Sequence, residues 1–150
     1  ETDVDLVKLL LKAGGNVNQA MTTDGSSPLY VASQNGNVAT VKVLLKAGGN
    51  VNQAETEDGC SPLFIASQNG NVAIVKVLIK AGGNVNQANI DGYTALGKSS
   101  QNGHLEVVRL LLQQPNIDVN KGKGRWSPLA LAKDDNYHEI VQLLKDAGAQ

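Results

Sequence analysis

The stretch that decides the fold runs from Asp24 to Asn52 and reads DGSSPLYVASQNGNVATVKVLLKAGGNVN. It returns at residues 58–86 as DGCSPLFIASQNGNVAIVKVLIKAGGNVN, 34 residues further along the chain. When the wider stretches 22–55 and 56–89 are aligned, only seven of their 34 positions differ. Neighbouring stretches this similar indicate a tandem duplication and therefore a repeat architecture.

The same unit recurs more loosely along the rest of the chain. The triplet Asn-Val-Asn at residues 16–18 reappears at 50–52 and 84–86, and it becomes Asp-Val-Asn at 118–120. We therefore interpret the 150 residues as a single domain of about four and a half units. The partial unit is 1–21, and the full units are 22–55, 56–88, 89–120 and 121–150.

Each unit predicts two helices and a loop. Ser27 and Pro28 suit the N-cap and first turn of a short helix, and Gly36 suits its end. Asn37 suits the N-cap of a second helix, because the residues after it show the apolar spacing of a half-buried helix. Residues 49–60 are rich in Gly, Asn, Asp and Thr, so we expect a polar connection that turns back as an extended finger.

The pattern Asp-Gly-x-Ser/Thr-Pro-Leu-x2-Ala-x3-Gly-x4-Val-x2-Leu-Leu-x3-Gly-x2-Val-Asn resembles the ankyrin repeat, most fully in residues 24–52 and 58–86. The resemblance implies an all-α solenoid of stacked helix-turn-helix units with β-hairpin-like finger loops. It also implies a scaffold that binds protein partners and has no catalysis of its own. The chain departs from the family pattern after Pro-Leu, where the usual His and its customary hydrogen bond are replaced by Tyr30, Phe64, Gly97 and Ala130.

Composition and charge disfavour several other classes of function. Thirteen basic and 14 acidic residues leave a net charge of −1, so binding to nucleic acid through bulk charge is disfavoured. No apolar run is long enough to cross a membrane, and residues 1–20 contain no basic segment followed by an apolar run. A single cysteine excludes an internal disulfide and favours a reducing compartment, so we predict a cytoplasmic location.

We predict no catalytic, cofactor or metal site. Residues 92–99, GYTALGKS, fit the phosphate-binding pattern G-x-x-x-x-G-K-S/T, but no buried strand precedes them and they stay in repeat register. His104 and His138 stand at the starts of second helices, where capping or packing explains them. Cys60 has no neighbouring base in the sequence, and we expect an exposed, free thiol.

The two ends of the array differ from its middle. Residues 1–20 match the second helix and finger of a unit whose first helix is missing. Because a solenoid needs polar caps at its ends, we expect either a longer array or a different capping element upstream. The second helix of the last unit is more polar and suits a C-terminal cap.

Charged residues also follow the repeat. Lysine pairs spaced i,i+4 recur on successive second helices, at Lys8/Lys12, Lys42/Lys46 and Lys76/Lys80. A solvated helix face explains them, and weak contact with anionic surfaces is the alternative.

One row of positions indicates a binding surface. The residue immediately before the Ser or Thr of each first helix should point from the finger to solvent, and it reads Ser26, Cys60, Tyr93 and Trp126. Tyr and Trp dominate interface hot spots, so we predict that Tyr93 and Trp126, with the neighbouring Arg125, form the strongest partner contact. In the alternative, Trp126 packs down onto the neighbouring finger.

Gly97 distinguishes the third full unit from the others. It stands where Tyr30 and Phe64 carry rings, so we expect a notch flanked by Phe64, Tyr93 and Trp126. Because Gly weakens a helix, we also expect residues 93–103 to open locally before residues 60–70.

The predicted function is a protein–protein interaction module that uses the concave helix groove and the finger tips. The complete set of expected partner-binding residues is Tyr93, Trp126, Arg125, Phe64, Tyr30, Lys98, Glu57, Asp58 and Cys60. One alternative is a structural spacer within a larger multidomain protein. A remote alternative is nucleotide or nucleic-acid binding through Lys98, Arg125 and Trp126. The identity of the protein partner stays open.

Overall fold

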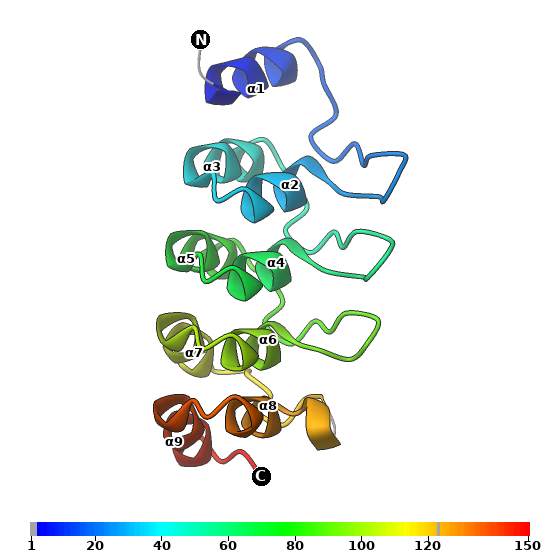
Figure 1. The fold of residues 1–150 in the computed structure, drawn as a ribbon. Coiled ribbons are helices and arrows are strands. Elements are labelled where there is room, and N and C mark those ends of the chain that lie inside the picture. Colours follow the sequence, from blue (N-terminus) through cyan, green and yellow to red (C-terminus); the bar gives the residue numbers. More distant parts are fainter. Residues whose placement is uncertain (1–2, 123) are drawn as a thin grey trace.

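The computed structural model describes residues 3–122 and 124–150, and its helices stack in one direction with loops projecting from one side (Figure 1). The helices are α1 (Asp3–Lys12), α2 (Pro28–Gln34), α3 (Val38–Lys46), α4 (Pro62–Gln68), α5 (Val72–Lys80), α6 (Ala95–Gln101), α7 (Leu105–Leu112), η1 (Gly124–Trp126), α8 (Pro128–Asp134) and α9 (His138–Asp146). This arrangement confirms the predicted all-α solenoid. Within the described part of the chain, the fingers contain one isolated antiparallel bridge, Ala88 with Thr94, and no longer ladder.

A hydroxyl N-cap begins every first helix of the array. The Oγ of Ser27 accepts a hydrogen bond from the Tyr30 N–H at 3.1 Å, and the Thr94 hydroxyl does the same for the Gly97 N–H. Ser61 and Ser127 cap α4 and α8 in the same way. These caps satisfy one of the otherwise unpaired N–H groups of a helix start, as the sequence predicts.

The link between first and second helix is equally regular. Gly36 adopts φ +74°, which reverses the chain after α2 at little steric cost. The Oδ1 of Asn37 then accepts from the Thr40 N–H at 3.1 Å and begins α3, so the predicted cap is confirmed. In the next repeat Asn71 makes no such cap, because its amide is directed to the Ser33 carbonyl at 3.5 Å.

The recurring Asn-Val-Asn triplet joins each repeat to the next. The Oδ1 of Asn18 accepts from the Asn50 N–H at 2.7 Å, and the Oδ1 of Asn52 accepts from the Asn84 N–H at the same distance. Asn86 continues the series, with 2.8 Å to the Asp118 N–H and 2.7 Å from its Nδ2 to the Asn116 carbonyl. An amide is suited to this position because it can both donate and accept.

The core runs continuously through the stack. The first helices α2, α4, α6 and α8 pack on one another, and α3, α5, α7 and α9 each pack on the first helix of the same pair (Figure 1). Leu29, Leu63 and Leu96 are buried between the layers, together with Leu78 and Leu111 of the second helices. The helix α1 packs on α3, in the place of a second helix, as its sequence predicts.

A smaller cluster lies on the finger side of the first helices. Tyr30, Cys60, Phe64 and Ile65 form it, and Tyr93 packs against its edge. Tyr30 and Phe64 occupy the position that carries His in the family pattern, so apolar packing replaces the customary hydrogen bond in these two repeats.

Candidate functional site

The two large aromatic side chains predicted to bind a partner are in contact. Tyr93 precedes Thr94, the N-cap of α6, and Trp126 ends η1 just before the N-cap of α8. Their ring centroids lie 5.0 Å apart with the planes tilted by 53°. Such tilted pairs are favourable because the positive edge of one ring faces the negative face of the other. Both rings are half-buried, so each keeps part of its surface in solvent.

Two cations flank the rings. The Nζ of Lys98 lies 4.8 Å from the centroid of Tyr93, and the Cζ of Arg125 lies 4.3 Å from the Trp126 ring. Together these side chains form a row of cation, ring, ring and cation. We name this row the cation–aromatic cluster, and its members in order are Lys98, Tyr93, Trp126 and Arg125. Lys98 also donates to the Oε1 of Gln101 at 2.9 Å. Cation–π contacts hold both long side chains close to the rings.

The sequence predicts a Trp126 side chain that points to solvent, and in the structure this side chain is half-buried. The side chain is neither freely projecting nor fully covered, because the Tyr93 ring takes one part of its surface and the Arg125 guanidinium another. The structure brings Tyr93, Lys98, Arg125 and Trp126 together although up to 33 residues separate them in the sequence.

The expected notch at Gly97 is wrong. Gly97 is buried, and a Cβ placed on it would lie 3.5 Å from the Cδ1 of Leu131 and 3.7 Å from the Trp126 carbonyl oxygen. Atoms of the neighbouring repeat therefore lie in ordinary contact distance of the place where the side chain would begin. The repeat therefore replaces its missing side chain with atoms from α8 and from the end of η1.

Three of the expected contact residues are not accessible. Tyr30, Cys60 and Phe64 expose only 8%, 7% and 3% of their surface, because they pack on one another in the smaller cluster. Ser26 is buried as well, so the row of finger positions points to solvent only where it carries large rings. A small side chain at this position is covered by its neighbours, whereas a ring extends beyond them.

Cys60 is a buried thiol, and the expectation of an exposed one is wrong. Its burial, together with the nearby carboxylates of Glu55 and Asp58, raises the pKa of the thiol to about 12. The thiol is therefore protonated and poorly nucleophilic at neutral pH. Burial, followed by the nearby Cys60 and the carboxylates of Glu55 and Asp58, raises the pKa of the Tyr30 hydroxyl to about 12.

Sequence reasoning missed Glu55. Its carboxylate is 6% exposed and accepts backbone N–H bonds from Glu57 at 2.7 Å, Asp58 at 3.1 Å and Cys60 at 2.7 Å. These bonds hold the finger so that Glu57 and Asp58 stay exposed at its tip. In the next repeat Asn89 replaces Glu55 and its Oδ1 accepts from the Tyr93 N–H at 2.9 Å. The exchange of Glu55 for Asn89 at equivalent positions is the feature of the sequence that indicates this role in the finger.

The family model for ankyrin repeats (three copies) matches residues 1–89 and 66–150. The chain belongs to the ankyrin-repeat family. Ankyrin repeats are generally protein–protein interaction modules, and the family is a non-enzymatic interaction fold. A search of curated proteins gives no match. The family accounts for the stacked fold.

The phosphate-loop pattern is part of the ankyrin architecture. The Gly97 N–H donates to the hydroxyl of Thr94, the N-cap of α6, and the Lys98 N–H donates to the Thr94 carbonyl, so these N–H groups cannot converge on a phosphate. Lys98 itself lies over Tyr93. His104 contacts the Gln68 carbonyl at 2.8 Å through Nε2, a packing role between repeats.

Metal-binding clusters and membrane-spanning helices are both absent from residues 3–122 and 124–150. No three His, Cys, Asp or Glu side chains there lie close enough to hold a metal ion. None of the ankyrin helices is both long and apolar enough to cross a membrane.

The lysines of the second helices, which together with Arg109 we name the basic stripe, are exposed as expected. Lys42, Lys46, Lys76 and Lys80 are all exposed at the surface of α3 and α5. Arg109 continues it on α7, where it forms ion pairs with Glu106 and Glu139. Exposed pairs of this kind contribute little to stability, so a solvated face explains the stripe.

Proposed function

We propose that this ankyrin-repeat chain is a non-catalytic protein–protein interaction module whose principal contact is the cation–aromatic cluster. The observation that carries the proposal is the row of Lys98, Tyr93, Trp126 and Arg125 on the finger side of α6 and η1. Tyr, Trp and Arg are the residues that most often supply the binding energy of an interface. Here they form one contiguous patch that is already ordered before a partner arrives.

The chemistry of the cluster favours an acidic partner segment that carries an aromatic or apolar residue. The two rings offer apolar surface, and the two cations offer partners for carboxylates on either side of it. Among the residues that the structure describes, neither Lys98 nor Arg125 has a carboxylate within ion-pair distance. Because the rings already restrain both cations, ordering them costs less on binding.

The acidic finger tip extends the proposed surface. Glu57 and Asp58 are exposed, and they belong to the finger that precedes α4. A partner that meets the cluster with carboxylates would meet this finger with a basic residue, because opposite charges set the orientation of an interface.

A cytoplasmic location for the chain belongs to the same proposal. Fractionation of cells that express the protein tests it.

The test is affinity capture from a cell lysate with quantitative mass spectrometry. The baits are the unchanged array, the double variant Tyr93→Ala/Trp126→Ala, and the single variant Arg125→Ala. The matched control is Ile90→Ala, which removes an exposed apolar side chain, 70% accessible, from the finger before α6. Circular dichroism establishes that each variant is folded.

The proposal requires a set of proteins that the unchanged array and the Ile90 variant retain and that both cluster variants lose. Purified candidates should then bind more weakly to Arg125→Ala and at higher salt. If the cluster variants retain the same proteins as the unchanged array, the cluster is not the contact. A complete lack of specific proteins would favour the structural-spacer function.

A further inference from the structure

Three neighbouring finger tips form an exposed edge of the repeats that contain α4, α6 and α8, and they project from one side of the stack (Figure 1). We name them the acidic tip (residues 55–60), the central tip (89–93) and the basic tip (121–122 and 124–126). The Ile90 N–H donates to the Asp58 carbonyl at 2.9 Å, which joins the central tip to the acidic tip. On its other side, a Cβ placed on Gly122 would lie 3.4 Å from the Gly92 carbonyl oxygen. The central tip therefore lies between the other two.

The two outer tips carry opposite charges. Glu57 and Asp58 are exposed on the acidic tip, and Lys121 and Arg125 are exposed on the basic tip. Within residues 3–122 and 124–150, none of these four side chains forms an ion pair. They are therefore available to a partner that carries the opposite charges in the reverse order.

The central tip carries an exposed apolar side chain. Ile90 and Thr56 occupy the same place in successive fingers, because each donates its N–H to an aspartate carbonyl of the preceding finger, at 2.9 Å and 2.8 Å. Ile90 replaces the hydroxyl of this position with an apolar group that is 70% exposed. A partner that covers it gains free energy from the apolar surface removed from water.

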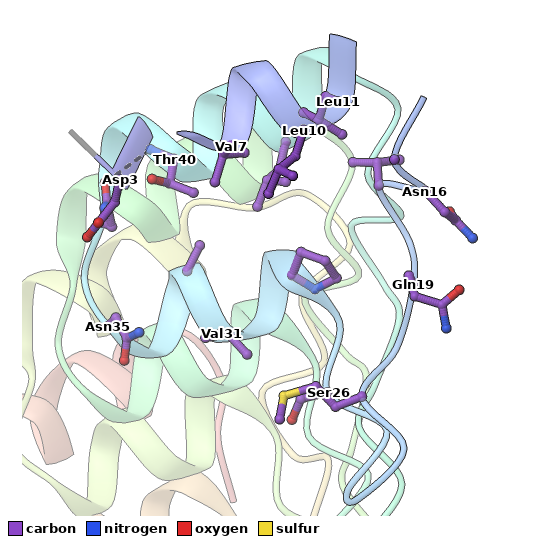
Figure 2. Close-up of a pocket in the computed structure, with 17 residues that line it drawn as sticks. Asp3, Val7, Leu10, Leu11, Asn16, Gln19, Ser26, Val31, Asn35 and Thr40 are labelled. Atoms are coloured by element: carbon purple, nitrogen blue, oxygen red, sulfur yellow. Dashed lines mark hydrogen bonds between the residues drawn. The ribbon is translucent and has the colours of Figure 1, made fainter. Parts of the chain in front are cut away.

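The finger before α2 does not continue this row of charges. Its Asp24 is half-buried, and the Asp24 carboxylate accepts the Ser26 N–H at 2.9 Å. Ser26 in turn lines the groove between α1, α2 and the start of α3 (Figure 2). The row of exposed, unpaired charges therefore begins at the acidic tip.

We propose that two copies of this chain pair through the three tips, antiparallel about a two-fold axis at the central tip. The acidic tip of each copy then meets the basic tip and the cation–aromatic cluster of the other, and the two Ile90 side chains meet at the axis. A two-fold axis makes both charged contacts at once, because each contact is repeated in reverse. This inference rests on the proposed function, since it names a second copy as the partner of the cluster.

Charge decides the orientation of the pair. A parallel pairing would place Glu57 and Asp58 of one copy against the same carboxylates of the other, and like charges repel. The antiparallel pairing leaves one unfavourable contact, between the exposed Asp91 side chains of the two central tips. Because exposed ion pairs are individually weak and are screened by salt, the pair should be transient and should dissociate at high ionic strength.

Sedimentation velocity of the purified chain tests the pairing. We expect self-association at protein concentrations up to about 1 mM and an ionic strength of about 0.05 M, and dissociation at about 0.5 M. A chain that stays monomeric at the lower ionic strength overturns this proposal. The proposed function would still stand, because a different protein can carry the same charges.

Two charge-reversed variants identify the contact. Lys121→Glu/Arg125→Glu makes both outer tips acidic, and Glu57→Lys/Asp58→Lys makes both basic, so each variant alone should associate at least about tenfold more weakly. Their equimolar mixture should associate again, because every charged contact of the mixed pair is attractive. Circular dichroism establishes that each variant is folded. Failure of the mixture to associate overturns the proposal.

The matched control is Lys42→Glu/Lys46→Glu, which makes the same change in net charge on the exposed face of α3. This variant should still associate, and loss of its association would mean that net charge, not the tips, governs the pairing, which overturns the proposal.

Two substitutions in the central tip test the position of the axis. Ile90→Asp should weaken association at least about tenfold, because it brings two further carboxylates together, and it should fold because the side chain is exposed. Asp91→Asn should strengthen association about threefold, because it removes the repulsion between the two copies. Unchanged association of both variants, or a weaker one for Asp91→Asn, places the axis elsewhere and overturns the proposal.

Discussion

Replacement of Gly97 by alanine should stabilise the array, although the residue is buried. Gly97 lies inside α6, and a glycine in a helix interior costs about 1 kcal/mol relative to alanine. A Cβ at this position would meet the Leu131 Cδ1 at 3.5 Å, the Thr94 Oγ at 3.6 Å and the Trp126 carbonyl at 3.7 Å. These are ordinary van der Waals distances, so the new methyl group is accommodated without displacement of its neighbours.

The magnitude follows from two favourable contributions. Removal of the glycine penalty contributes about 1 kcal/mol, and burial of one methyl group contributes up to about 0.8 kcal/mol. We therefore expect the free energy of unfolding to rise by about 1–2 kcal/mol. For a chain of this size, that corresponds to a midpoint temperature higher by roughly 2–8 °C. Urea and thermal unfolding followed by circular dichroism measure both quantities.

Hydrogen exchange locates the effect. In the unchanged protein, amides of residues 93–103 should exchange faster than those of residues 60–70, because the glycine weakens α6 locally. Gly97→Ala should slow exchange in residues 93–103 by roughly five- to thirtyfold. The matched control is Gly92→Ala in the same repeat, where φ is +86° and nothing lies within 4 Å. That variant should be less stable by about 1 kcal/mol, because alanine is strained at positive φ.

Two results would refute this reasoning. An unchanged or lowered stability of Gly97→Ala would mean that Leu131 and Trp126 resist even one methyl group. Equal protection of residues 93–103 and 60–70 in the unchanged protein would mean that α6 is not the weak part of the stack.

Three further perturbations test other parts of the structure. Tyr93→Ala should shift the emission of Trp126 to longer wavelength and increase its quenching by acrylamide, because the ring 5.0 Å away shields it, and Ile90→Ala should change neither. Asn86→Ala should lower the free energy of unfolding by about 1–2 kcal/mol, because two hydrogen bonds between repeats are lost. Its control, Asn16→Ala, loses one hydrogen bond within its own loop and should lower the free energy of unfolding less. Because the pKa values of Cys60 and Tyr30 are raised, the folded state keeps protons that the unfolded state has already released at high pH. The free energy of unfolding should therefore be full below pH about 9 and fall towards pH 12. Urea unfolding across this range should show a shallower fall for Cys60→Ser, which carries the residue found at the equivalent position Ser26. For the same reason, the thiolate fraction of native Cys60 at pH 8 should be about a thousandfold below that of an unperturbed thiol of pKa 9.0, and slow reaction with a thiol reagent checks it.

The sequence by itself determined the helices and the repeat period of the stack. Ser27 and Asn37 carry caps that act within three residues of themselves, and Gly36 reverses the chain locally, so each of these effects can be deduced from neighbouring letters. The Asn-Val-Asn triplets likewise give the repeat period, because they recur at a fixed interval of 34 residues. The sequence singles out Tyr93 and Trp126 for their size and position, and the structure brings their rings into contact.

Only the tertiary structure decided which of the repeated positions face solvent. Ser26 and Cys60 stand in the same register as Tyr93 and Trp126, yet they are buried, because their exposure depends on the bulk of side chains one repeat away. The space beside Gly97 is lined by Leu131, a residue 34 positions later in the sequence. The cation–aromatic cluster also arises between repeats, where packing distances of a few ångströms decide the outcome and no local pattern records them.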